Sequence, residues 1–178
     1  MLLPNDPEIL LVEDNLVVVD SVIRMLSKLG YNKVESVSDY NAAVQILSLK
    51  KIHLVLIDIL LSGKETGIEL GGHIRENKNI PFIFITSNSD RVTVAEAKKV
   101  TPNGYLVKPF DREDLFTAIE IALFNFRSNC QLQKRVLSWI QILIQQPYFL
   151  TVFSSKNSIF TIEYPFLKSY ILKQIMFI

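Results

Sequence analysis

The sequence predicts an α/β fold in which five parallel strands form one sheet and helices cover both of its faces. Through the first 127 residues, short apolar runs alternate with amphipathic stretches, which is the pattern of repeated strand–helix units. Three of the runs are nearly continuous Val, Ile, Leu and Phe, as expected of strands that are buried on both faces. A hydrophobic content of 49% and a charged content of 21% are those of a chain that can bury a core.

Local signals place the elements in order along the chain. The expected strands are Ile9–Val12, Lys33–Ser36, His53–Ile57, Phe82–Ile85 and Tyr105–Val107, and the expected helices are 15–29, 39–50, 66–77, 90–100 and 112–127. Gly30 follows the first helix as a left-handed stop. Ser38 and Asp111 precede helices as N-cap candidates. Gly71 and Gly72 weaken the third helix by about 1 kcal/mol each relative to alanine.

The composition changes after Arg127. Residues 1–130 carry 14 Lys and Arg against 17 Asp and Glu, whereas residues 131–178 carry 5 against 1. Gln131–Gln146 is consistent with an apolar helix that Pro147 ends, and the last thirty residues show no clear period. No apolar run there reaches the length of about 18 residues that a membrane span needs. We therefore expect a short helical or irregular extension after the α/β domain, and no contact with a membrane.

Polar side chains follow four of the five expected strands at the point where each strand ends. Glu13 and Asp14 follow the first strand, Asp58 the third, Thr86 the fourth and Lys108 the fifth. The carboxyl ends of parallel strands meet at one edge of a sheet, where open α/β folds keep their sites. We expect these side chains to lie in one crevice.

Three carboxylates in one crevice repel each other unless a cation neutralises them. Oxygen ligands in an incomplete protein shell suit Mg²⁺, which retains waters and takes phosphate oxygens. Asp58 would then be a nucleophile that attacks phosphorus and becomes an acyl phosphate. The Lys108 ammonium would stabilise charge on the transferring oxygens, and the Thr86 hydroxyl would bind one of them.

Four segments resemble the receiver domain of response regulators. They are Ile9-Leu-Leu-Val-Glu-Asp-Asn15, Leu54-Val-Leu-Ile-Asp-Ile-Leu-Leu61, Pro81-Phe-Ile-Phe-Ile-Thr86 and Gly104-Tyr-Leu-Val-Lys-Pro-Phe110. The resemblance covers about residues 7–127 and is specific, because all four segments occur in the right order and each lies at a strand end. It implies a flavodoxin-like doubly wound sheet of five strand–helix units with strand order 2-1-3-4-5.

The resemblance also implies a role for each matching residue. Asp58 matches the phosphoacceptor, Asp14 the direct metal ligand and Glu13 an acid that acts mainly through water. The backbone carbonyl of Leu60 matches the third protein ligand of Mg²⁺. Lys108 matches the phosphate-binding lysine.

Three further positions match the conformational part of the family pattern. The bond from Lys108 to Pro109 is expected to be cis, as only an X-Pro bond readily can be. Thr86 and Tyr105 match the switch pair, in which the hydroxyl moves toward the phosphoryl group and the aromatic ring turns inward. The change would reach the surface formed by the fourth helix, the fifth strand and the fifth helix.

This sequence departs from the family pattern after Asp58. Ser62 and Gly63 stand where many receivers have proline, and we expect little loss of chemistry from that change. Leu60 lies two residues past the acceptor and cannot orient an attacking water through its side chain. We therefore expect a longer phosphoryl lifetime than with a polar residue at this position.

The resemblance makes residues 1–127 the receiver domain and residues 128–178 a linker helix with an apolar, basic tail of unknown function. The chain would be a cytoplasmic signalling protein rather than an enzyme with its own substrate. A separate histidine kinase or histidine phosphotransfer protein would supply the phosphoryl group. The tail leaves two further partners open, which are a second copy of the chain and DNA.

Two alternative functions remain at this point. Residues 157–162 resemble the first strand of a LytTR-type DNA-binding domain, so the chain could be a transcriptional regulator whose C-terminal segment contacts DNA, although the segment is too short for that whole domain. An aspartyl phosphatase would usually carry a second Asp two residues after the nucleophile. That position is Leu60 here, which disfavours the phosphatase.

Overall fold

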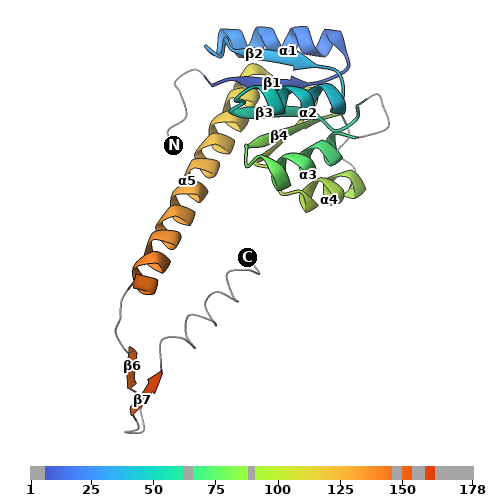
Figure 1. Cartoon of the computed structure of the whole chain (residues 1–178). Coiled ribbons are helices and arrows are strands. Elements are labelled where there is room, and N and C mark those ends of the chain that lie inside the picture. The colour runs from blue at the N-terminus through green and yellow to red at the C-terminus, as the bar shows by residue number, and fades with distance from the viewer. Residues whose placement is uncertain (1–6, 62–65, 88–90, 146–149, 154–158, 163–178) are drawn as a thin grey trace. The chain divides into compact units, whose positions relative to one another are not determined.

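The computed structural model describes the chain except for residues 1–6, 62–65, 88–90, 146–149, 154–158 and 163–178. Five parallel strands form one sheet in the order β2-β1-β3-β4-β5, with helices between them (Figure 1). The strands are β1 (Ile9–Val12), β2 (Val34–Val37), β3 (Leu54–Asp58), β4 (Phe82–Thr86) and β5 (Gly104–Val107). The helices are α1 (Leu16–Lys28), α2 (Tyr40–Leu49), α3 (Gly67–Asn77), α4 (Arg91–Lys99) and α5 (Arg112–Gln145). The predicted fold class and strand order are confirmed.

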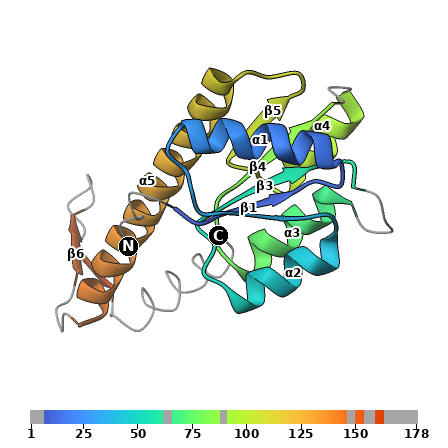
Figure 2. The same cartoon turned by 90° about the horizontal axis from the view of Figure 1, so that it is seen from above.

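Helices cover the two faces of the sheet and enclose two apolar cores (Figure 2). On one face, α1 and α5 pack against the sheet through Val22, Leu26, Leu115 and Ile119. On the other face, α2, α3 and α4 contribute residues such as Leu47, Leu70, Ile74 and Ala97. Strands β1, β3 and β4 are buried along their whole length, which explains why their sequences are nearly continuous apolar runs.

Helix ends show which sequence signals act as caps. Gly30 has a φ of 90°, and the amide of Tyr31 donates to the Leu26 carbonyl at 2.9 Å, so α1 ends in the expected left-handed turn. The sequence predicts Ser38 as the N-cap of α2, but the structure has Asp39 in that position. The Asp39 carboxylate accepts from the Ala42 amide at 3.0 Å, whereas Ser38 lies one residue too early for that bond.

The last helix differs from its predicted length. Helix α5 runs without a break from Arg112 to Gln145, so the expected end at residue 127 is wrong. Its start carries reciprocal capping bonds, in which the Asp114 amide donates to Asp111 Oδ1 at 2.8 Å and the Asp111 amide donates to Asp114 Oδ2 at 3.1 Å. Among the described residues, no helix has the length and the apolar content that crossing a membrane requires.

The chain divides into two compact units, Met1–Asn129 and Cys130–Ile178. The second unit contains the last part of α5 and an antiparallel pair of strands, β6 (Leu150–Phe153) and β7 (Ile159–Ile162), with Leu150 opposite Ile162. This strand pair was not predicted from the sequence. The functional division of the chain at residue 127 stays a prediction.

We expect His53 to make the stability of the first unit depend on pH. His53 Nδ1 accepts from the Glu8 amide at 3.0 Å, and burial, with a smaller effect of Lys51, lowers the pKa of His53 below its ordinary value of about 6.5. Because the folded state favours the neutral ring, stability is fully present above that ordinary value and falls as the pH drops through the window below it.

Chemical unfolding of wild type and His53→Gln at pH 7.5 and 5.5 measures this dependence. The loss of unfolding free energy between the two pH values should shrink in His53→Gln, and it should persist in the control His73→Gln. An equal loss in the wild type and His53→Gln would contradict the assignment.

Candidate functional site

The sheet brings the predicted polar residues to one edge. Glu13 directly follows β1, Asp58 and Thr86 are the last residues of β3 and β4, and Lys108 directly follows β5. In the parallel register Val12 pairs with Ile57. On the other side of β3, Asp58 pairs with Ile85. The backbone amide of Lys108 donates to the Thr86 carbonyl at 2.8 Å, which fixes the start of the Lys108 side chain beside β4.

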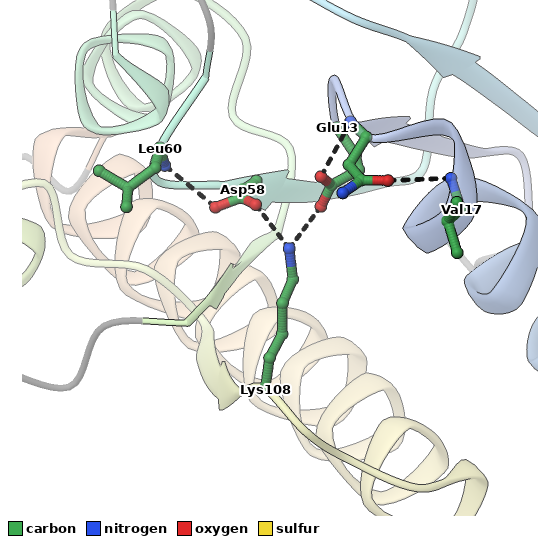
Figure 3. Close-up of polar contacts among 6 residues, drawn as sticks. Glu13, Val17, Asp58, Leu60 and Lys108 are labelled. Atoms are coloured by element: carbon green, nitrogen blue, oxygen red, sulfur yellow. Dashed lines mark hydrogen bonds and ion pairs between the residues drawn. The ribbon is translucent and has the colours of Figure 1, made fainter.

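Lys108 joins the two carboxylates at the centre of this edge (Figure 3). Its Nζ lies 2.6 Å from Glu13 Oε2 and 2.6 Å from Asp58 Oδ2. The three side chains are largely removed from solvent, with 15% of Lys108, 2% of Glu13 and 8% of Asp58 exposed. Ion pairs in such a setting are weakly screened, so the ammonium holds both carboxylates in a fixed position.

The charges of these groups depend on one another. Burial raises the pKa of Glu13, and the nearby Asp58 carboxylate raises it further, while the hydrogen bond from Lys108 opposes both effects. Burial alone would lower the pKa of Lys108, but its hydrogen bonds to Asp58 and Glu13 outweigh that effect and raise the pKa. Lys108 is therefore charged at neutral pH, and it is the cation that the two acids share.

The segment that follows Asp58 is ordered by backbone bonds. The Leu60 amide donates to Asp58 Oδ1 at 3.0 Å, and the Ile59 amide donates to the Ile85 carbonyl at 3.2 Å. The Leu60 side chain is 58% exposed and points away from the Lys108 ammonium in Figure 3. The two oxygens of the Asp58 carboxylate thus have different partners, Leu60 on one and Lys108 on the other.

The remaining predicted residues lie at or near the same edge. Asp14 follows Glu13 and is partly exposed, and Thr86 is fully buried. Tyr105 is a partly buried residue of β5 whose ring meets Phe84 edge-on, with 6.5 Å between ring centroids. The Lys108–Pro109 peptide bond is cis.

One residue beside the site was not singled out from the sequence. The Asn15 side chain accepts from the Val17 amide at 3.0 Å as the N-cap of α1, and the Asn15 amide donates to Glu13 Oε1 at 3.2 Å. Asn15 thereby links the start of α1 to the carboxylate of Glu13. An Asn directly before an apolar helix is a recognisable cap signal, so this role could have been predicted.

The donor set at this edge fits Mg²⁺ with an incomplete protein shell. Among the described residues, no three His, Cys, Asp or Glu side chains are arranged to hold a metal ion by themselves. Mg²⁺ usually takes one or two carboxylates, keeps several waters and binds phosphate oxygens. The Asp58 carboxylate and the acids after β1 are hard oxygen donors of this kind.

Comparison with known families agrees with the fold. The family model described as "Response regulator receiver domain" matches residues 9–120. The transcriptional regulatory protein PdtaR of Mycobacterium tuberculosis is 32% identical over 128 residues, which cover 72% of this chain and 62% of that protein. The aerobic respiration control protein ArcA of Escherichia coli is 34% identical over 61% of this chain and 45% of its own length. The chain thus spans about half to three fifths of these regulators.

Solved structures show the same relationship. The signal receiver domain of a modulated diguanylate cyclase from Desulfovibrio desulfuricans has a TM-score of 0.66 and 32% identity, over 70% of this chain and 99% of that one. The receiver domain of a sensor histidine kinase from Pseudomonas aeruginosa, solved with a magnesium ion in its active-site cleft, has a TM-score of 0.61 and 30% identity. That match covers 66% of this chain and 98% of the other.

Proposed function

Because this chain belongs to the response regulator receiver domain family of two-component systems, we propose that it accepts a phosphoryl group on Asp58. The donor is a phosphohistidine of a histidine kinase or a histidine phosphotransfer protein. The observation that carries the proposal is the shared contact of the Lys108 ammonium with Asp58 and Glu13, 2.6 Å from each carboxylate. A buried acid held by a cation at the carboxyl edge of a parallel sheet is a nucleophile in position to receive an anionic group.

Each residue of the site has its own role in the transfer of the phosphoryl group. A carboxylate oxygen of Asp58 attacks phosphorus, the bond from phosphorus to the donor nitrogen breaks, and the nitrogen keeps the electron pair. Lys108 donates to an oxygen of the transferred group and Thr86 to another, which stabilises the charge on them. The carboxylates of Asp14 and Asp58 with the Leu60 carbonyl would hold Mg²⁺, which would supply positive charge to the phosphoryl oxygens. Incubation with Mg²⁺ and acetyl phosphate, followed by intact mass, tests the proposal.

The change at Asp58 would reach other proteins through β5. Thr86 lies at the end of β4 beside the Lys108 backbone, and Tyr105 on β5 contacts Phe84 of β4. We propose that a shift of the Thr86 hydroxyl toward the phosphoryl group frees space that Tyr105 fills, which alters the surface of α4, β5 and α5. The name of the relative PdtaR as a transcriptional regulatory protein supports an output at transcription.

We expect the phosphorylated chain to lose its phosphoryl group slowly because of Leu60. The Leu60 amide is bonded to Asp58 Oδ1, and its exposed side chain offers no group that orients a water. A Leu60→Asn variant should hydrolyse its acyl phosphate several-fold faster, since an amide can position the attacking water. Loss of the adduct with time, followed by intact mass, measures the rate. A Leu49→Asn control should keep the wild-type rate, and an unchanged rate in Leu60→Asn would remove the explanation.

We also propose that the second unit binds a second copy of the chain through α5. Five large apolar residues on this part of the helix are 48% to 64% exposed: Leu132, Val136, Leu137, Trp139 and Ile142. Leu132, Val136, Trp139 and Ile142 recur at spacings of three and four residues and share one face of the helix, whereas Leu137 lies on another side. At about 100 Å² from each half-exposed side chain, this face of two helices together offers on the order of 800 Å², which is at the low end of protein interfaces.

Sedimentation of the full chain tests this contact. We expect a dimer for the wild type, a monomer for Val136→Glu and a dimer for Gln141→Glu, because Gln141 lies on the opposite side of the helix from Leu132, Val136 and Trp139. A monomeric wild type would exclude the contact.

A further inference from the structure

The first residue of α3 lies against the backbone of Asp58. A Cβ atom added at Gly67 would overlap the carbonyl oxygen of Asp58 and lie 2.9 Å from the Cα atom of Ile59. Both neighbours are backbone atoms of the site, so no side chain can turn aside to make room. Only a residue without a Cβ atom permits this approach.

Backbone bonds hold the segment after Asp58 from two sides. The Gly67 amide donates to the Ile59 carbonyl at 3.1 Å, and the Ile59 amide donates to the Ile85 carbonyl of β4 at 3.2 Å. A capping box fixes the start of α3 directly before Gly67. In it, the Glu69 amide donates to Thr66 Oγ1 at 3.3 Å and the Thr66 amide donates to Glu69 Oε2 at 2.6 Å. The start of α3 is therefore a rigid support for the site.

We propose that Gly67 is a positioning residue for phosphoryl transfer, which sets where the Asp58 carboxylate and the Leu60 carbonyl stand. The inference rests on the proposed function of Asp58 and extends it to a residue that does not touch the phosphoryl group. A side chain at residue 67 would push the backbone of Asp58 and Ile59 away by about 1 Å, and a displacement of that size can slow a positioned reaction by about 100-fold.

Two other glycines of α3 make a matched series. A Cβ atom at Gly71 would lie 2.8 Å from Phe84 Cζ and 3.0 Å from Phe82 Cε2, which are side chains of the core and not backbone of the site. A Cβ atom at Gly72 would meet only Val100 Cγ1 at 3.5 Å, an ordinary contact. Alanine in place of each glycine adds one methyl group that meets a different neighbour, so the three variants separate displacement of the site from strain in the core.

The test compares Gly67→Ala, Gly71→Ala and Gly72→Ala in the full chain. Calorimetric titration with MgCl₂ gives the metal affinity, intact mass after acetyl phosphate gives the phosphorylation rate, and circular dichroism gives the melting temperature. Gly67→Ala should lose at least tenfold in Mg²⁺ affinity and about 100-fold in rate at a temperature where it is folded. Gly71→Ala should melt earlier but keep both values within twofold, and Gly72→Ala should match the wild type.

Two results would overturn the inference. One is wild-type Mg²⁺ affinity and rate in Gly67→Ala, and the other is an equal loss of both in a Gly71→Ala protein of the same melting temperature. If Gly67→Ala does not fold, Thr66→Ala carries the test, because it removes the cap of α3 and adds no atom near Asp58. Thr66→Ala should bind Mg²⁺ several-fold more weakly than the wild type. An unchanged Mg²⁺ affinity would contradict the claim that the start of α3 positions the site. A wild type without an adduct would refute the proposed function of Asp58 and the role of Gly67 in transfer, whereas the Mg²⁺ affinities would still show whether Gly67 positions the site.

Discussion

We expect the replacement of Asp58 by alanine to abolish covalent phosphorylation of the chain by acetyl phosphate. Asp58 is the acid at the end of β3, and its Oδ2 atom lies 2.6 Å from the only ammonium that the described residues bring to this edge, that of Lys108. Glu13 shares the same ammonium, and each acid also accepts from a backbone amide, Glu13 from Asn15 and Asp58 from Leu60. The proposal that Asp58 is the nucleophile therefore rests on its match to the phosphoacceptor of the receiver family. Intact mass should show one added phosphoryl group in the wild type and none in Asp58→Ala.

A matched variant separates this role from a general loss of acidic residues. Asp20→Ala changes an exposed acid of α1 that pairs with Arg24, and it should leave the adduct at the wild-type level. An acyl phosphate is a mixed anhydride, so hydroxylamine should release phosphate from the wild type and leave a hydroxamate at Asp58, whose mass differs from that of both the phosphorylated and the unmodified chain. An equal adduct in Asp58→Ala and the wild type would contradict the proposed function.

The strands of the sheet could be predicted closely because strands that are buried on both faces are nearly continuous apolar runs in the sequence. Ile9–Val12 was placed without error, and the other four strands were shifted or extended by a single residue at an end. At β3 the shift matters, since Asp58 is the last residue of the strand and pairs with Ile85. The positions of the strand ends were sufficient to predict which edge of the sheet carries the candidate site.

Features that depend on contacts between distant residues could not be predicted in this way. The role of Gly67 rests on its distance from the backbone of Asp58, nine residues earlier, and an isolated glycine before an apolar helix gives no such information. The shared contact of Lys108 with Glu13 and Asp58 was expected only as proximity, and the sequence did not indicate that one ammonium serves both acids. The strand pair β6–β7 was missed because the apolar and polar residues of the last thirty positions show no clear period.

Replacing Lys108 by methionine should impair both phosphorylation and stability. Methionine keeps the apolar stem but removes the ammonium, which leaves the carboxylates of Glu13 and Asp58 buried without their cation. We expect the rate of phosphorylation by acetyl phosphate to fall on the order of 100-fold, because one charged donor to the transferred group is lost. In metal-free buffer the free energy of unfolding should fall by about 3 kcal/mol, the cost of breaking a buried ion pair.

The matched control is Lys99→Met, whose ion pair with Glu96 is 68% and 51% exposed and should contribute little. Denaturant unfolding with and without MgCl₂ measures the stability of each variant. Added Mg²⁺ should raise the unfolding free energy of Lys108→Met more than that of the wild type. In the variant, a bound cation would neutralise Glu13 and Asp58, which have lost the Lys108 ammonium. An unfolding free energy of Lys108→Met equal to that of the wild type would show that the two carboxylates do not need the ammonium.

Lys108→Arg tests whether charge alone is sufficient. Nζ lies 2.6 Å from both Glu13 Oε2 and Asp58 Oδ2, so a compact ammonium occupies the point where the two carboxylates meet. The planar guanidinium is larger and prefers two parallel bonds to one carboxylate, so it cannot occupy that point without moving one acid. Lys108→Arg should therefore recover much of the stability that Lys108→Met loses but little of the phosphorylation rate, since stability needs a positive charge and transfer needs a donor at a fixed place.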